Sequence, residues 1–404
     1  AVRNVSNAVL VCKRGPLGSS VFEGDIPATL DDGLTIYGVK VNVLNVLGAG
    51  DAFMSGLLRG YLNNEGWEKS CQYANACGAL VVSRHGCAPA MPSKEELDNY
   101  LLRQYEVERP DLDKELTHLH RVTTRDRSWE ELNILAFDHR MQLENMALAS
   151  GKSLTLIPEV KRLILKAAEQ VVEQDNLQSK VGVFVDGTYG QSVLNAVTGK
   201  NWWVARPIEL PGSRPLRLEH GNIGSQLISW PAEQIVKCLV FFHPEDEITL
   251  RLEQEALVKE VYQACCQSGH ELLIEVILPA DMPKSDAFYI QSLERLYNLG
   301  IKPDWWKLPP LSASSWDTVT CLINERDAHC HGVVILGLDA SMQALENGFN
   351  AASGKGIVKG FAVGRSIFAK PAKAWFEGDI NDDAFIEQIK ANYRHLINVW
   401  NQRG

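Results

Sequence analysis

The sequence lacks any apolar run approaching the roughly 20 residues that a helix needs to span a bilayer, and no signal-peptide pattern opens it. It also lacks an excess of basic residues, because 40 Lys and Arg stand against 50 Asp and Glu, a formal net charge of −10. That balance excludes a broad nucleic-acid or anionic-membrane surface, so any phosphate group must be bound locally. We therefore expect a cytoplasmic globular protein that binds neither nucleic acid nor membranes.

The nine cysteines include no Cys-x-x-Cys pair, and several of them, such as Cys238 and Cys321, lie in apolar runs. This usage fits reduced thiols in a cytosol rather than disulfides. The triplet His329-Cys330-His331 contains ligand types suited to a metal. It stands alone before a strand, so we expect no metal site there.

The chain has no initial methionine and enters an apolar strand at residues 8–11, so we expect a fragment that begins within a domain. A turn at residues 13–18 and a second strand at 20–22 predict a hairpin. Two domains are expected for 404 residues. We predict a first domain at residues 1–105, a charged linker at 106–131 with one helix near 111–120, and a second domain at 132–404.

A motif of small residues opens a predicted helix in the first domain. Gly48, Ala49 and Gly50 allow backbone N–H groups to converge at the helix N-terminus, where the helix dipole favours an anion. Asp51 follows in the first turn, where it can take a proton from a hydroxyl that attacks a phosphoryl group. An ordinary turn followed by a capping aspartate is the alternative explanation.

The longer stretch from Asn45 to Phe53 resembles the C-terminal signature of ribokinase-type (PfkB) sugar kinases, with residues 75–86 similar to the helix that follows. The resemblance implies that Gly48, Ala49 and Gly50 form an anion hole, that Asp51 is the base, and that an intact kinase domain uses ATP and Mg. The family usually has Asp-Thr-Thr before the first glycine, whereas this chain has Asn45-Val46-Leu47. Only roughly the last third of a fold of about 300 residues is present, so we expect this segment alone to phosphorylate nothing.

Strands and helices alternate after residue 131. The expected strands are 132–137, 180–185, 202–207, 235–242, 271–278, 304–308, 332–336 and 358–363, and the expected helices include 158–173, 246–268, 286–298, 315–327, 341–352 and 383–400. Eight strand–helix units over about 270 residues predict a (β/α)8 TIM barrel. The whole chain is thus predicted to be α/β, with a partial ribokinase-like segment before the barrel.

The sixth predicted strand carries a lysine near its C-terminal end. Lys307 follows Trp305 and Trp306 and precedes Pro309, and we expect the two tryptophans to wall its side chain. Lowering a lysine pKa from about 10.4 to about 7 requires roughly 4–5 kcal/mol, which burial against apolar rings can supply. Such an amine can form a Schiff base with a ketone. The alternative is a lysine that extends past the rings into solvent.

In a TIM barrel, polar residues at strand C-termini point into the active site. Gly337, Gly364 and Arg365 are expected to form a phosphate site after the last two strands. Glu275 lies in an apolar run and needs a partner such as Lys307, while Lys237 would be a second cation that lowers the pKa of the nucleophile. The other charged residues at strand ends include Asp138, Arg140, Asp186, Arg206, Glu209, His243 and Asp339.

Four stretches carry a second resemblance. Residues 136–140, 205–215, 305–308 and 358–365 look like the aldolase-like (DUF2090-type) barrel that is fused behind 5-dehydro-2-deoxygluconokinase in bacterial inositol catabolism. The barrel is more distantly similar to class I tagatose-bisphosphate aldolases, whose Schiff-base lysine lies on strand six, where Lys307 is expected. Those aldolases tend to carry a glutamate two positions after the lysine, whereas this chain has Pro309.

The resemblance implies a lyase that cleaves 2-deoxy-5-keto-gluconate 6-phosphate to dihydroxyacetone phosphate and malonate semialdehyde without a cofactor. Lys307 would be the nucleophile, Arg206 or Arg140 would bind the substrate carboxylate, and Asp138, Asp186 and Glu275 are the candidates for proton transfer. A homo-oligomer remains open. Two alternatives are a metal-dependent aldolase using His139, His220 and His243, and a barrel that only scaffolds or regulates the kinase activity of a full-length fusion.

Overall fold

A computed structural model describes residues 2–125, 127–338 and 340–403 of the chain. The contacts divide it into two compact units, Ala1–Asp126 and Arg127–Gly404, each considered by itself below. In the described parts of the chain, no helix is both long enough and apolar enough to cross a membrane.

The first unit combines a small antiparallel sheet with helices. Its sheet has the order β1-β2-β3, and pairing of Leu10 with Phe22 confirms the predicted hairpin. Residues of α3 and α4 share a core cluster with residues of α1 and α2. The elements are β1 (Leu10–Lys13), β2 (Ser19–Phe22), β3 (Leu34–Ile36), α1 (Ala49–Leu62), α2 (Gly66–Val82), α3 (Lys94–Arg103) and α4 (Lys114–Thr123).

Glycines bring α1 and α2 into close contact. A Cβ added at Gly56 would lie 2.6 Å from the Tyr73 carbonyl, and one at Gly60 would lie 2.4 Å from Ser70 Oγ. The two helices therefore approach each other closely at Gly56 and Gly60, where a side chain would not fit.

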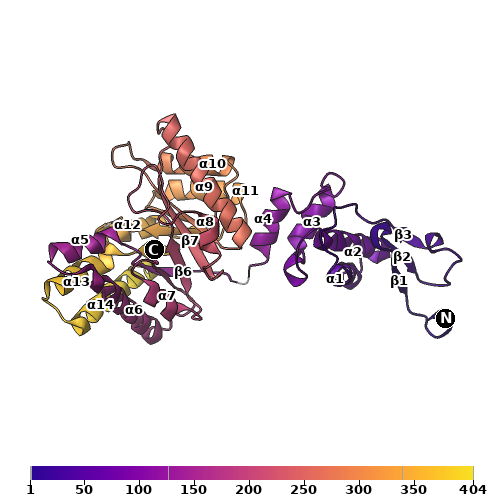
Figure 1. Ribbon diagram of the computed structural model, residues 1–404, viewed down its shortest axis with the longest axis horizontal. Coiled ribbons are helices and arrows are strands. Elements are labelled where there is room, and N and C mark those ends of the chain that lie inside the picture. Colours follow the sequence, from indigo (N-terminus) through magenta and orange to yellow (C-terminus); the bar gives the residue numbers. More distant parts are fainter. Residues whose placement is uncertain (1, 126, 339, 404) are drawn as a thin grey trace. The chain divides into compact units, whose positions relative to one another are not determined.

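The second unit is a closed barrel of parallel strands, which confirms the predicted α/β barrel fold (Figure 1). Going round the barrel, the order is β10-β11-β4-β5-β6-β7-β8-β9. Every predicted barrel strand is present, with ends within one residue of the prediction. The strands are β4 (Leu132–Ala136), β5 (Val181–Phe184), β6 (Trp203–Pro207), β7 (Gln234–Phe241), β8 (Leu272–Ile277), β9 (Trp305–Leu308), β10 (Gly332–Leu336) and β11 (Val358–Val363).

Helices follow the barrel strands, and the predicted ones are confirmed. The last of them, α14, contacts the start of β4, where Tyr393 Oη donates a hydrogen bond to the Asn133 carbonyl at 2.6 Å. The helices are α5 (Met141–Ala149), α6 (Ile157–Gln174), α7 (Gln191–Val197), α8 (Ile223–Leu227), α9 (Ile248–Ser268), α10 (Asp286–Asn298), α11 (Ala313–Arg326), α12 (Met342–Ala351), α13 (Arg365–Glu377) and α14 (Asp382–Asn401).

Successive residues of each strand point alternately into the barrel and towards the helices, which gives two separate apolar layers. Trp305 packs inside the barrel against Trp203, whereas Trp306 faces the helices, where its Nε1 donates to Tyr297 Oη at 2.9 Å. The expectation that both tryptophans wall Lys307 is therefore wrong, because neighbouring residues of a strand point to opposite faces. The ring beside the Lys307 amine belongs to Phe184, with Nζ 4.5 Å from the ring centroid.

Candidate active site

A cavity of about 290 Å³ opens at the C-terminal ends of the barrel strands. This is the end at which a TIM barrel carries its active site. Residues 208–219, which follow β6, contribute Glu209, Pro211 and Gly212 to one wall. The barrel strands and the residues directly after them contribute Asp138, Lys237, Glu275, Lys307, Gly337 and Gly364.

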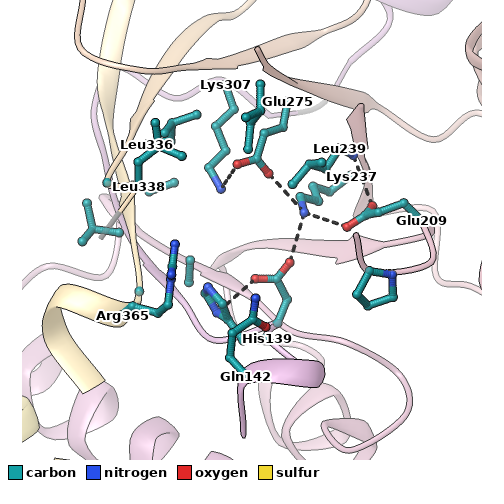
Figure 2. A pocket seen from close by; sticks show the side chains of 18 of the residues that line it. His139, Gln142, Glu209, Lys237, Leu239, Glu275, Lys307, Leu336, Leu338 and Arg365 are labelled. Atoms are coloured by element: carbon teal, nitrogen blue, oxygen red, sulfur yellow. Dashed lines mark hydrogen bonds and ion pairs between the residues drawn. The ribbon is translucent and has the colours of Figure 1, made fainter. Parts of the chain in front are cut away.

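Lys307 and Glu275 form the ion pair expected between neighbouring strands. The Lys307 Nζ lies 3.0 Å from Glu275 Oε1, and the lysine is only 6% exposed. Figure 2 shows Lys307, Glu275, Lys237 and Glu209 connected in series across the cavity. The Lys307 amine thus lies inside the mouth of the barrel, in contact with the ring of Phe184 and the carboxylate of Glu275.

Lys237 stands at the centre of three carboxylates. Its Nζ lies 2.8 Å from Glu209 Oε1, 3.1 Å from Glu275 Oε2 and 3.3 Å from Asp138 Oδ2. Burial alone lowers the pKa of Lys237, but the three carboxylates outweigh it and hold the pKa well above its ordinary value. At an effective dielectric of about 20, each contact near 3 Å contributes roughly 5 kcal/mol, against a desolvation cost of several kcal/mol per ion. The three carboxylates therefore favour the charged ammonium form of Lys237.

The same contacts keep the carboxylates ionised. Burial raises the pKa of Asp138, but the ammonium groups of Lys237 first and then Lys307 more than reverse this and leave the pKa below its ordinary value. Burial likewise opposes ionisation of Glu275, and Lys237 and Lys307 together lower its pKa. Asp138 and Glu275 can therefore accept protons or hydrogen bonds at neutral pH.

His139 lines the cavity as a neutral imidazole. Its Nδ1 lies 3.8 Å from Asp138 Oδ1, and its ring meets the edge of Phe368. Burial lowers the pKa of His139 to about 4; Asp138 opposes the shift and the charge of Lys307 adds to it. His243 is buried with Nε2 3.1 Å from the Pro283 carbonyl, and His220 is exposed, so the three histidines do not converge.

The three residues expected to bind phosphate lie on the wall of the cavity formed by the ends of β10 and β11. Gly337, Gly364 and Arg365 all line the cavity, and α13 begins at Arg365. A Cβ at Gly364 would lie 2.0 Å from the Ala136 carbonyl, so only glycine fits there. Figure 2 shows Arg365 on the opposite side of the cavity from Glu209. Asp339, expected after the seventh strand, lies outside the described residues.

Arg140 also reaches the cavity, at the start of α5. It is 5% exposed, its Nη1 bonds to Glu219 Oε2, and its Nη2 lies 3.6 Å from Glu209 Oε1. The guanidinium thus faces two carboxylates of the segment that follows β6.

Two predicted residues are placed elsewhere. Asp186 follows β5, is fully buried and pairs with Lys161 of α6. Lys161 also donates to the carbonyls of Phe137 at 2.6 Å and His139 at 3.0 Å. Arg206 points out of the barrel, with its guanidinium 3.9 Å from the Trp230 ring centroid, and burial lowers its pKa to about 10. Neither Asp186 nor Arg206 lines the cavity.

Glu209 and Lys161 were not among the site residues expected from the sequence. Glu209 was visible only as one charged residue after a strand. Lys161 had a clearer signal, because it lies on the apolar stripe of α6 with Ile157, Ile164 and Ala168. A lysine at such a position must find a partner inside the protein.

The first unit places its motif beside a separate cavity of about 550 Å³. Gly48 caps α1 with φ +84, a left-handed conformation that favours glycine. Ala49 and Gly50 line this cavity together with Lys13 and Asn75. Asp51 is exposed in the first turn of α1 and does not line it.

Comparison with known proteins identifies both segments. Residues 96–404 match the family described as "Uncharacterized protein conserved in bacteria (DUF2090)". Residues 2–94 match the pfkB family carbohydrate kinases. The predicted order, a kinase segment followed by a DUF2090-type barrel, is confirmed.

Curated relatives are similar to about a quarter of this chain. "Probable fructokinase-6, chloroplastic" of Arabidopsis thaliana is 34% identical over 102 residues, 24% of this chain and 25% of the relative. "5-dehydro-2-deoxygluconokinase" of Halalkalibacterium halodurans is 32% identical over 93 residues, 23% of this chain and 27% of the relative. The chain thus spans about a quarter of the length of these relatives.

Among solved structures, fructose-bisphosphate aldolase from Plasmodium falciparum, in complex with TRAP and a small-molecule inhibitor, is similar with a TM-score of 0.53 and 11% identity. The likeness covers 72% of this chain and 97% of that one. At this identity it shows the fold alone.

Proposed function

The chain belongs to the DUF2090 family, and from this premise we propose that its barrel is a class I aldolase in which Lys307 forms a Schiff base with a keto substrate. The observation that carries the proposal is the position of the Lys307 amine. It lies in one cavity with a paired carboxylate, a second lysine and a glycine–arginine corner suited to phosphate.

We propose 2-deoxy-5-keto-gluconate 6-phosphate as the substrate. The amine adds to the C5 ketone and water leaves, which gives an iminium that can accept electrons. When a base takes the proton of the C3 hydroxyl, the C3–C4 bond breaks and its electron pair enters the iminium to form an enamine. Malonate semialdehyde leaves first, and protonation and hydrolysis then release dihydroxyacetone phosphate. No metal or cofactor is required, because the iminium is the electron sink.

The contacts suggest a role for each neighbouring group. Glu275 lies 3.0 Å from the Lys307 amine and is suited to the proton transfers that form and hydrolyse the imine. Asp138 and Arg140 both follow β4 and line the cavity. Asp138 is therefore suited to the C3 hydroxyl and Arg140 to the carboxylate, with the phosphate at Gly337, Gly364 and Arg365.

Borohydride trapping tests the proposal. The full chain is reduced in the presence of dihydroxyacetone phosphate, which forms the same iminium from the product side, and the adduct is mapped by peptide mass spectrometry. We expect an adduct on Lys307, its loss in Lys307→Ala, and its retention in Lys284→Ala, which removes an exposed lysine of the same domain. An adduct on Lys237 would contradict the assignment.

The same preparation separates the alternatives. Cleavage of the proposed substrate that is lost with EDTA, without a trapped adduct, would support a metal-dependent aldolase. No turnover and no adduct would support a barrel that scaffolds or regulates a kinase.

We propose separately that the 550 Å³ cavity beside Gly48, Ala49 and Gly50 accepts part of a nucleotide. The support is its position at the N-terminus of α1, where converging N–H groups favour an anion. We propose ATP and Mg for a complete kinase domain and no phosphotransfer by this segment alone. Incubating the chain with 5-dehydro-2-deoxygluconate, ATP and Mg and measuring ADP tests this, and ADP formation would contradict it.

A further inference from the structure

The carboxylate subsite proposed at Arg140 is already occupied by a side chain of the protein. Arg140 Nη1 bonds to Glu219 Oε2, and Arg140 Nε is buried without a hydrogen-bond partner among the residues described. One carboxylate bound end-on therefore leaves part of the guanidinium unsatisfied. A planar guanidinium is best matched by a bidentate carboxylate.

The two carboxylates near Arg140 differ in how firmly they are held. Glu209 lies 2.8 Å from Lys237 Nζ and accepts from Leu239 N at 3.2 Å. Glu219 has one further hydrogen bond, from Thr188 Oγ1 at 3.0 Å, and its side chain is 16% exposed against 5% for Glu209. Glu219 is therefore the partner that an incoming carboxylate can replace.

The backbone that carries Glu219 is held in place. Residues 208–219 fold back on themselves, with Leu210 N donating to the Arg217 carbonyl at 2.7 Å and Glu219 N to the Ile208 carbonyl at 2.8 Å. Arg214 ties this segment to Asp246 and Asp281. Exchange of Glu219 thus requires a side-chain rotation rather than movement of the segment.

We propose that Glu219 is a specificity-determining residue that competes with the substrate carboxylate for Arg140. A carboxylate-bearing ligand replaces Glu219 and forms the same kind of ion pair, so the guanidinium of Arg140 keeps a negatively charged partner. A neutral ligand cannot do so and leaves Glu219 in place, because displacing it would leave the buried Arg140 with only its longer 3.6 Å contact to Glu209. The inference rests on the proposed function, in which Arg140 binds the carboxylate half of the substrate.

Calorimetric titration of the full chain with 3-hydroxypropionate tests the proposal. This ligand has the carboxylate and carbon number of malonate semialdehyde but cannot react with an amine. We expect Glu219→Gln to bind it about tenfold more tightly than the wild type, because one competing hydrogen bond to a charged group is removed. Thr188→Val, which removes only the hydroxyl that holds Glu219, should give a smaller gain of two- to threefold.

Two further variants separate this exchange from a general change in charge. Glu253→Gln removes a carboxylate that pairs with Arg217 of the same segment, and it should bind like the wild type. Adding Arg140→Gln to Glu219→Gln should abolish the gain, and 1,3-propanediol should bind every variant equally. Unchanged or weaker binding by Glu219→Gln and Thr188→Val would overturn the proposal, as would a gain that survives loss of Arg140.

The outcome is distinct from that of the trapping experiment. A gain in Glu219→Gln without an adduct on Lys307 leaves a carboxylate site but removes the aldolase. An adduct without the gain keeps the aldolase and removes the role of Glu219.

Discussion

At the scale of single residues, the cavity contains two lysines with different surroundings. Lys237 contacts three carboxylates, whereas Lys307 contacts one and lies over the ring of Phe184. The three carboxylates hold the proton of Lys237, which makes it a poor nucleophile. Lys237 is better suited to keeping Asp138, Glu209 and Glu275 ionised and in position around the reacting amine.

Replacing Lys237 with methionine should destabilise the barrel strongly, and most at high pH. The substitution leaves three buried carboxylates with too little positive charge nearby. We expect the free energy of unfolding to fall by about 3–5 kcal/mol near pH 8. Without Lys237 the pKa values of Asp138 and Glu275 should rise, so protonation relieves the strain as the pH falls towards 5. In the wild type those pKa values are lowered and the pairs persist.

Urea unfolding of Lys237→Met and the wild type at pH 8 and pH 5 measures this. Lys284→Met, at an exposed position, is the control and should match the wild type at both values. A stability difference that stays constant or grows as the pH falls would contradict the prediction.

His139 should make the barrel less stable in mild acid. Its folded pKa of about 4 lies below the unfolded value of 6.5, so the unfolded chain binds more protons between these values and stability rises with pH across that window. The histidine should account for about 2 kcal/mol of lost stability between pH 7 and pH 5. Chemical denaturation of His139→Gln should show a pH dependence flatter by this amount, and parallel curves for the two proteins would rule the effect out.

The position of strand ends allowed much of the site to be predicted from sequence. Lys307, Glu275 and Asp138 meet because all parallel strands of a barrel end at one rim. The prediction that Arg206 points into the site was wrong, because strands buried on both faces show no alternation of polar and apolar residues. Nothing in the sequence then says that Trp203 and Ala205 face inward and Arg206 outward.

At the scale of elements, the sequence predicts the strands and longer helices well but misses α13. Pro371 lies inside that helix and suggests a break, because proline cannot donate the usual bond to the carbonyl four residues earlier. In the structure, Asn392 of α14 donates to this carbonyl, on Ile367, at 2.8 Å. A donor 25 residues later in the chain compensates for the proline, and short-range patterns cannot reveal it.

Asn392→Ala should therefore destabilise the barrel by about 1–2 kcal/mol, because the Ile367 carbonyl is left without this donor. In a Pro371→Ala background the cost should be much smaller, since the new backbone N–H can bond to Ile367. A double-mutant cycle in urea measures the coupling between the two positions. Equal costs in both backgrounds would show that Asn392 does not compensate for Pro371.

At the scale of the whole molecule, the family match and the structural units have different boundaries. The DUF2090 match begins at residue 96, within α3, whereas the second compact unit begins at Arg127. Leu97 and Tyr100 of α3 and Leu116 of α4 belong to a core with Tyr73 and Leu80 of α2. The first 30 or so residues of the family match thus complete the core of the kinase-like segment.

Two truncated proteins should distinguish these boundaries. Residues 127–404 contain a closed barrel with its own core and should unfold in urea at the same midpoint as the barrel in the full chain. Residues 96–404 should share that midpoint, but the amides of α3 and α4 should exchange freely, because isolated helices of this length are marginal in water. Hydrogen exchange by mass spectrometry resolves both regions. A lower midpoint for residues 127–404 than for 96–404 would instead show that α3 and α4 stabilise the barrel, and protected amides in 96–404 would show that they fold without α1 and α2.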